Sequence, residues 1–92
     1  MALRRNGAGM KPDPLGEALR FAQAQRALPP SAQRRRIRES AGVSLQAIAD
    51  TIGVDRVTVY RWEAGLRRPH GEQAIAYLKV LGRIEQATGA VA

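Results

Sequence analysis

The chain has 92 residues, which is enough for one small domain with a single modest core and no second lobe. Its 15 Lys and Arg against 8 Asp and Glu give a formal net charge of +7, and all 15 cations except Lys11 and Lys79 are Arg. The donor fork of Arg matches phosphate groups and guanine edges, so the surplus favours a nucleic-acid partner. The Arg-rich composition of a GC-rich genome is the alternative explanation.

The composition also excludes several kinds of chemistry. The chain has no Cys, which rules out disulfides, thiolate zinc sites and thiol catalysis, and its single His, His70, cannot form a metal site alone. The carboxylates are scattered singly and no Gly-rich loop follows a strand, so we expect neither an enzyme nor a cofactor. The basic start lacks an apolar run and no segment is as long as a membrane span, so we expect a cytoplasmic protein without membrane contact.

Residues 1–14 are rich in Gly, Pro and charge, and we expect them to form a flexible basic arm. They offer little apolar surface to bury, so they add charge rather than core. Entry of Arg4, Arg5 and Lys11 into a minor groove is the alternative to disorder.

A first helix is predicted over about 15–27, with Pro14 at its start. Its apolar residues recur at helical spacing and form one stripe, made of Leu15, Ala18, Leu19 and Ala22. We expect this stripe to fold back on the domain and fill its core; pairing with the same helix of a second copy is the alternative. The segment Leu28-Pro29-Pro30 ends the helix, because Pro cannot donate a helical hydrogen bond.

Two further helices are predicted in the middle of the chain. Ser31 is the predicted N-cap of a helix that runs to about Ala41, with Gly42 as its left-handed terminator. Ser44 is the predicted N-cap of a short helix that ends at Gly53. The apolar side chains of this short helix share one face and are Leu45, Ile48, Ala49 and Ile52.

The last two helices follow the same local signals. Asp55 is the predicted N-cap of a helix over about 56–64, which Gly65 closes before the loop at 66–69. A final helix runs from about Gly71 to at least Leu81, and its inward residues are Ala74, Ile75, Leu78 and Leu81. Gly82 either ends this helix or lies on its exposed side, with Ile84 continuing the apolar stripe. No segment alternates with the period of a strand, so an all-α fold is predicted.

Residues 45–64 together have the pattern of a helix-turn-helix. Such a motif needs a small residue where the second helix crosses the first, here Ala49, and a turn residue that tolerates positive φ, here Gly53. It also needs apolar side chains that hold the two helices at a steep angle. Residues of this kind are Ile48, Ile52, Val54, Val59 and Trp62. Each feature alone is common, but their occurrence within one short span is a specific signal.

The helix at 56–64 has two different sides when its residues are placed about 100° apart. The side facing the core holds Thr58, Val59 and Trp62, and the outer side holds Arg56, Val57, Tyr60, Arg61 and Ala64. In a major groove, Arg can pair with guanine, Val can touch a thymine methyl and Tyr can reach a phosphate or a base edge. Contact with another protein surface is the alternative for Val57 and Tyr60.

Residues 37–81, IRESAGVSLQAIADTIGVDRVTVYRWEAGLRRPHGEQAIAYLKVL, resemble the Cro and repressor class of helix-turn-helix domains, also called the Xre family. The most specific parts are AGVS, the small-residue and Gly spacing of the turn, and VTVYRWEAGLRRP. The resemblance implies a compact bundle of four or five helices, commonly dimeric, whose third helix lies in the major groove. It places Arg56, Val57, Tyr60 and Arg61 at base-reading positions. It also implies that Arg38 pairs with Glu63.

The sequence departs from this family at two positions. Leu45 stands where the family usually has a Gln that bonds phosphate, so the helix N-terminal amides and Gln46 are left for that role. Arg34 stands where an apolar residue is usual, so we expect the extra helix at 15–27 to anchor the start of this helix. The three Arg at 34–36 are otherwise interpreted as a solvated face. The predicted phosphate contacts are Ser44, Gln46, Thr58, Arg67, Arg68 and Arg35.

The predicted organisation is a basic arm at 1–14, an extra helix with a Pro-Pro linker at 15–30, and a helix-turn-helix domain at 31–88. The predicted function is sequence-specific binding of double-stranded DNA by a small transcription regulator of phage or plasmid type, acting as a homodimer on DNA. One alternative is an antitoxin-type repressor that also binds a protein toxin. The other is an adaptor that uses the same surface for protein contact without DNA.

Overall fold

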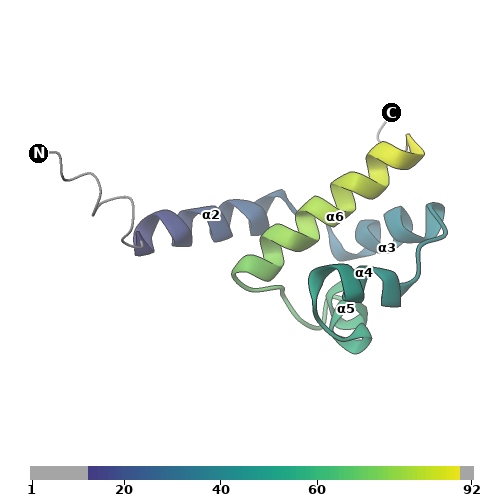
Figure 1. Ribbon diagram of the computed structural model, residues 1–92, viewed down its shortest axis with the longest axis horizontal. Coiled ribbons are helices and arrows are strands. Elements are labelled where there is room, and N and C mark those ends of the chain that lie inside the picture. Colours follow the sequence, from purple (N-terminus) through teal and green to yellow (C-terminus); the bar gives the residue numbers. More distant parts are fainter. Residues whose placement is uncertain (1–12, 90–92) are drawn as a thin grey trace, which may run out of the picture.

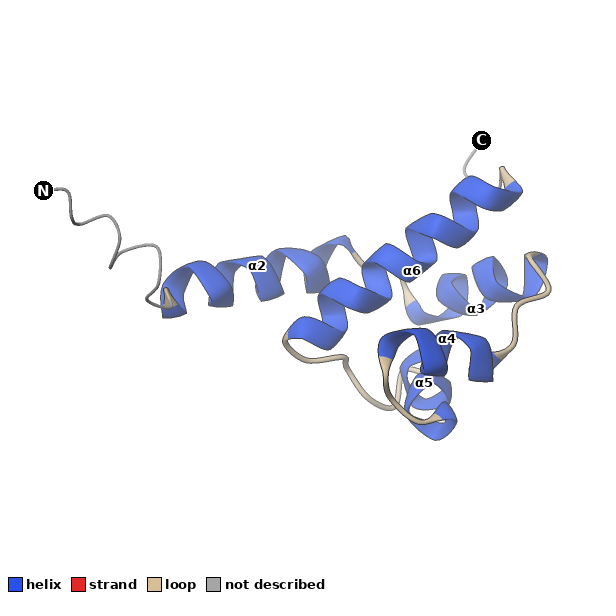
Figure 2. Cartoon of the chain, in the orientation of Figure 1, coloured by secondary structure: helices blue, strands red, loops and turns tan. Residues whose placement is uncertain are grey.

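The computed structural model describes residues 13–89, which form five α-helices and no strand (Figures 1 and 2). In chain order they are α2 (Pro14–Ala27), α3 (Ser31–Ser40), α4 (Leu45–Ile52), α5 (Arg56–Glu63) and α6 (Glu72–Thr88). The all-α prediction is therefore confirmed. Residues 1–12, which hold nearly all of the predicted arm, lie outside the described part of the chain.

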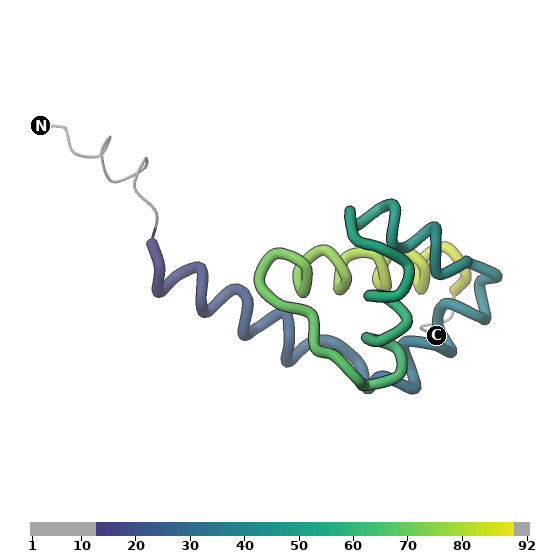
Figure 3. Tube along the Cα trace, turned by 90° about the horizontal axis from the view of Figure 1, so that it is seen from below, coloured from purple at the N-terminus to yellow at the C-terminus, as the bar shows by residue number. Residues whose placement is uncertain are grey.

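The long helix α6 is the centre of the arrangement: it packs against α2, α3 and α4, while α5 packs against α3 and α4. The two short helices α4 and α5 lie together on one side of α6 (Figure 1). Figures 1 and 3 both show the N-terminal half of α2 extending beyond the rest of the bundle.

The local signals around α4 and α5 act as predicted. The Ser44 hydroxyl accepts a hydrogen bond from the amide of Ala47, and the Asp55 carboxylate accepts one from the amide of Thr58, so both N-caps are confirmed. Gly53 has φ of 90°, in the left-handed region that disfavours any side chain, and its amide donates to the carbonyl of Ala49 at 2.8 Å. The chain can therefore turn from α4 into α5 within a few residues.

The predicted cap of α3 is wrong. Ser31 is already the first helical residue, and no side chain caps the helix. The helix begins one residue earlier than predicted: Pro30 is the N-cap residue, its carbonyl accepts the first hydrogen bonds from the amides of Gln33 and Arg34, and its ring has no acceptor with which to cap the helix. The helix ends at Ser40, with Gly42 in the left-handed conformation two residues later.

The final helix is longer than its minimum predicted extent. α6 runs through Gly82 to Thr88, and Gly89 ends it with φ of 69°. Of the two predicted roles for Gly82, the continuing helix is the correct one, since Ile84 is buried and extends the apolar side beyond Leu81. The deeply buried residues of α6 are Ala74, Tyr77 and Leu81, whereas Ile75 and Leu78 are half-buried. Tyr77 was not among the predicted core residues.

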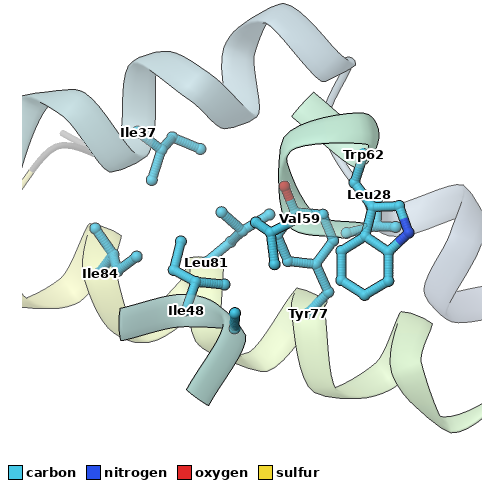
Figure 4. Close-up of a cluster of buried hydrophobic side chains, with 9 residues drawn as sticks. Leu28, Ile37, Ile48, Val59, Trp62, Tyr77, Leu81 and Ile84 are labelled. Carbon is cyan, nitrogen blue, oxygen red and sulfur yellow. The ribbon is translucent and has the colours of Figure 1, made fainter. Parts of the chain in front are cut away.

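The core gathers side chains from every helix except α2 and from the linker that follows it (Figure 4). Its largest members are Trp62 and Tyr77, whose ring centroids lie 4.8 Å apart at a tilt of 38°. Around them pack Leu28, Ile37, Ile48, Ala49, Val59, Leu81 and Ile84. The predicted locking residues Ile48, Val59 and Trp62 are fully buried, so α4 and α5 are held against α6 by the same cluster that forms the core.

The prediction for α2 is wrong in its orientation. The helix does pack on α6, but its buried residue is Ala24, and Leu28 from the linker reaches the core. The predicted inward residues Leu15 and Leu19 are 69% and 52% exposed. At about 100° per residue, Ala24 and Leu28 lie on the side of the helix roughly opposite to Leu15 and Leu19. The N-terminal half of α2 therefore carries an apolar stripe on its outer side.

Candidate nucleic-acid interface

α5 presents one face to the core and a different face to solvent, as the helical spacing predicts. Val59 and Trp62 are 0% and 1% exposed, and Thr58 is half-buried. Four residues of the predicted outer face, Arg56, Val57, Tyr60 and Arg61, are exposed, and so is the fifth, Ala64, which directly follows α5. Val57 and Tyr60 are 49% and 52% exposed although both are large and apolar for the most part. A helix face with two exposed apolar residues between two Arg has the donors and the apolar contacts that base edges require.

The N-terminus of α5 is fixed by a tight cap. The Asp55 carboxylate accepts hydrogen bonds from the Thr58 hydroxyl at 2.6 Å and the Thr58 amide at 3.1 Å. These two bonds, the hydroxyl first, lower the pKa of the exposed Asp55 carboxyl below its ordinary value. The hydroxyl of Thr58 thus gives its one hydrogen to Asp55 and has none for a phosphate oxygen, which disfavours the phosphate contact predicted for Thr58.

The C-terminal end of α5 is held by the predicted ion pair. Glu63 is buried, with its side chain 4% exposed, and the Arg38 guanidinium binds both of its carboxylate oxygens. The remaining arm of Arg38 donates to the carbonyl of Val43 at 2.9 Å. The hydrogen bond to Glu63 raises the pKa of Arg38, so the cation is held in its charged form. This pair connects α3, the loop before α4 and the last residue of α5.

Arg34 does not belong to a solvated face. Its Nε donates to the carbonyl of Pro29 at 2.7 Å, its Nη1 donates to the carbonyl of Trp62 at 3.1 Å, and its guanidinium carbon lies 5.8 Å from the centre of the Tyr77 ring. A cation at the C-terminal end of α5 also interacts favourably with the helix dipole. Arg34 therefore joins the linker after α2 to the end of α5, and this corrects the interpretation of its neighbourhood as solvated. Arg35 and Arg36 are exposed.

The remaining predicted phosphate contacts are exposed, and several have donors to spare. Ser44 uses its hydroxyl as an acceptor in the cap of α4 and keeps its own hydrogen. Gln46 donates one amide hydrogen to Asp50 and Arg35 donates its Nε to Glu39, which leaves further donors on both side chains. Arg67 and Arg68 lie exposed in the loop after α5.

Two shallow cavities show which of these residues lie together. Arg35, Leu45 and Tyr60 line a cavity of about 270 Å³ with the Arg38–Glu63 pair. Arg67 and Arg68 line another of about 360 Å³ with Arg34. Leu45 itself is half-buried against the core, so the position where the family has a phosphate-binding Gln serves packing here.

Features of other kinds of site are not seen in the described residues. Within residues 13–89, no three His, Cys, Asp or Glu side chains are grouped so that they could hold a metal ion. None of the helices formed by the described residues is long and apolar enough to cross a membrane.

Two short helices that cross at a Gly turn, with one side of the second helix in the core and an Arg-bearing side exposed, define the helix-turn-helix class of DNA-binding domains. A family model described as Helix-turn-helix matches residues 35–85, which is more than half of the chain. The chain therefore belongs to this helix-turn-helix family, which supports a DNA-binding regulator of the Cro and Xre type. Comparisons with curated proteins and with solved structures gave no significant match.

Proposed function

We propose that the chain binds a specific sequence of double-stranded DNA by placing α5 in the major groove, and that it regulates transcription as a small regulator of phage or plasmid type. The observation that carries this proposal is the outer face of α5. Val57 and Tyr60 are about half exposed there although they are large, and they stand between two exposed Arg. On a face that contacts only solvent, large apolar side chains such as Val57 and Tyr60 gain nothing from exposure. A major groove offers Val57 a thymine methyl and Tyr60 a phosphate oxygen or a base edge.

The base-reading residues in this proposal are Arg56, Val57, Tyr60 and Arg61. Each Arg pairs with guanine O6 and N7 through two donors, and Val57 contacts a thymine methyl. Tyr60 reaches a phosphate or a base edge. The caps and the Arg38–Glu63 pair support this role because they fix both ends of α5 to the body of the domain. An element that reads bases must keep a fixed register on the duplex.

Phosphate contacts supply most of the affinity in this proposal. They come from the amides at the N-terminus of α4 with Ser44 and Gln46, from Arg35 on α3, and from Arg67 and Arg68 after α5. Because each contact releases condensed counterions, the logarithm of the binding constant falls linearly with the logarithm of salt concentration, with a slope of about −0.9 per phosphate. A protein adaptor without DNA would have a nearly salt-independent affinity.

We further propose that two copies bind one operator, with half-sites about 34 Å apart. The exposed stripe of Leu15 and Leu19 on α2 supports a protein contact of some kind, since these side chains are 69% and 52% exposed. The same stripe favours the second candidate function, an antitoxin-type repressor that binds operator DNA and a protein toxin. In that case Leu15 and Leu19 would contact the toxin rather than a second copy of this chain.

One experiment tests these points together. Selection of bound sequences from a random duplex pool gives the site and its symmetry, and native mass measurement of the complex gives the stoichiometry. A palindromic site with two chains bound supports the regulator. Recovery of no sequence preference, with binding that is insensitive to salt, would contradict it.

A further inference from the structure

The helix α2 is hydrogen-bonded to the loop at 64–71, which connects α5 to α6. The side-chain amide of Gln25 on α2 donates to the carbonyl of Pro69 at 2.7 Å, across 44 residues of sequence and in a partly buried position. Pro69 is itself fully buried. The Phe21 ring lies next to Gly71, where a β-carbon would stand 3.9 Å from it. The C-terminal half of α2 is thus placed against the end of this loop.

The last turn of α5, from which the loop starts, is joined to the linker after α2 through Arg34. Arg34 bridges the carbonyl of Pro29 in the linker and the carbonyl of Trp62 in the last turn of α5. The amides of Leu66 and Arg67 in turn donate to the carbonyl of Arg61. The start of the loop is therefore fixed to α5, and its end is fixed to α2 by Gln25.

Between these two attachments lie the exposed side chains of Leu66, Arg67 and Arg68. These three side chains are not packed themselves, and the nearest fixed points beyond them are the buried Pro69 ring and its carbonyl, which Gln25 bonds. An Arg loses rotamer freedom and, in a mobile loop, backbone freedom as well when it binds a phosphate. Holding the loop in advance removes the second of these costs.

We propose that Gln25 is a positioning residue for DNA binding: it holds the loop so that Arg67 and Arg68 face the phosphates beside the groove that α5 occupies. Through this bond, α2 contributes to DNA affinity without touching DNA. This inference rests on the proposed function where DNA affinity is measured. The hold of Gln25 on the loop can also be measured in the free protein, without DNA.

The first test compares Gln25→Ala with Gln23→Ala, a matched change at an exposed residue of the same helix. Loss of one hydrogen bond corresponds to about a three- to tenfold change in an equilibrium constant. We expect Gln25→Ala to weaken every duplex alike by about this factor and to leave base preference and the salt slope unchanged, because the bound state keeps the same phosphate contacts. Gln23→Ala should leave all three unchanged. Equal effects of the two changes would overturn the proposal.

A double-mutant cycle then separates positioning from general destabilisation. If Gln25 acts through the loop, Gln25→Ala should have little further effect on DNA binding once Arg67 and Arg68 are both replaced by Ala. Independent, additive effects would refute the coupling. Thermal unfolding of each variant shows that the comparison is made between folded proteins.

Hydrogen exchange of the free protein keeps this inference distinct from the proposed function. Gln25→Ala should speed exchange of the Leu66 and Arg67 amides, which donate to the carbonyl of Arg61, relative to the unchanged chain and to Gln23→Ala, while the amides of α4 keep their rates. Unchanged loop rates would overturn the proposal even if DNA binding were confirmed. A chain that binds no duplex, but whose loop exchange responds as expected, would instead refute the proposed function alone.

Discussion

The ion pair between Arg38 and Glu63 gives the sharpest prediction about stability. Replacing Arg38 by Met leaves the Glu63 carboxylate in a site that is 4% exposed, at the C-terminal end of α5 where the helix dipole disfavours a negative charge. The loss of one partner of a buried pair costs about 3–5 kcal/mol, and we expect this change to lie at the upper end. Replacing Glu63 by Leu leaves Arg38, which is 13% exposed and still bonds Val43, so the lower end is expected.

These costs are large compared with the total stability of a domain of this size. A chain of this length has a total stability of roughly 5–14 kcal/mol, so either change removes a large part of it. Changing both residues together, Arg38→Met with Glu63→Leu, removes the uncompensated charge and should recover most of the loss. Urea unfolding of the four proteins at pH 7 measures the cycle. If the two single costs simply added in the double variant, our account of the pair as one buried unit would be refuted.

The other predictions concern reading, phosphate contact, the core and pH. Arg61→Ala should relax base preference at one position per half-site at a cost of about 1–3 kcal/mol, whereas Arg68→Ala should weaken all duplexes alike and reduce the salt slope by about one; equal losses on every sequence from both changes would contradict the base-reading assignment. Trp62→Ala should destabilise the domain by about 3–5 kcal/mol, because it truncates a buried aromatic; a loss below about 1 kcal/mol in urea unfolding would contradict the position of Trp62 in the core. Burial raises the pKa of Tyr77 to about 12, so this group leaves stability unchanged below about pH 10, and its ionisation lowers stability by up to roughly 2–3 kcal/mol as the pH rises through about 12. Alkaline unfolding followed by fluorescence should lack this component in Tyr77→Phe, which should be at least as stable at pH 7 because the Tyr77 hydroxyl has no hydrogen-bond partner among the described residues.

The part of the fold that sequence patterns predict well is the part governed by local chemistry. Ser44, Asp55 and Gly53 act within three or four residues of their own positions, so their roles follow from their neighbours along the chain. The division of α5 into two sides follows for the same reason, since its apolar residues at helical spacing include Val59 and Trp62, which the core surrounds.

The predictions that fail depend on contacts between distant segments. The spacing of Leu15 and Leu19 indicates an amphipathic helix, but it does not say on which side the rest of the domain lies. Ala24 and Leu28 have helical spacing too, and they are the side that α6 covers. In α6, Leu78 was predicted to face inward and Tyr77 was not, although Tyr77 lies three residues after the buried Ala74 and four before the buried Leu81. Only the position of Trp62 on α5, against which Tyr77 stacks, decides between them.

Arg34 shows why a run of three Arg is a poor guide to exposure. Its neighbours Arg35 and Arg36 are exposed, as a charge run predicts. Arg34 alone finds two carbonyl acceptors, one of them 28 residues away on α5, and an aromatic ring. A helical phase that turned Arg34 inward was available in the sequence, since Arg34 lies three residues before the buried Ile37. The sequence did not show that the carbonyls of Pro29 and Trp62 would lie close enough to accept hydrogen bonds from an inward Arg34.

Arg34 is joined by a hydrogen bond to the segment that precedes the helix-turn-helix domain. An Arg at a position that the family fills with an apolar residue would leave a gap in the core and a cation without a partner. The linker after α2 supplies what that position lacks: Leu28 packs in the core cluster, and the carbonyl of Pro29 accepts from Arg34. The fork of Arg34 then reaches the end of α5, while Gln25 reaches the loop beyond it. The segment before the helix-turn-helix domain is therefore integrated with the C-terminal end of α5, the helix that we propose reads DNA.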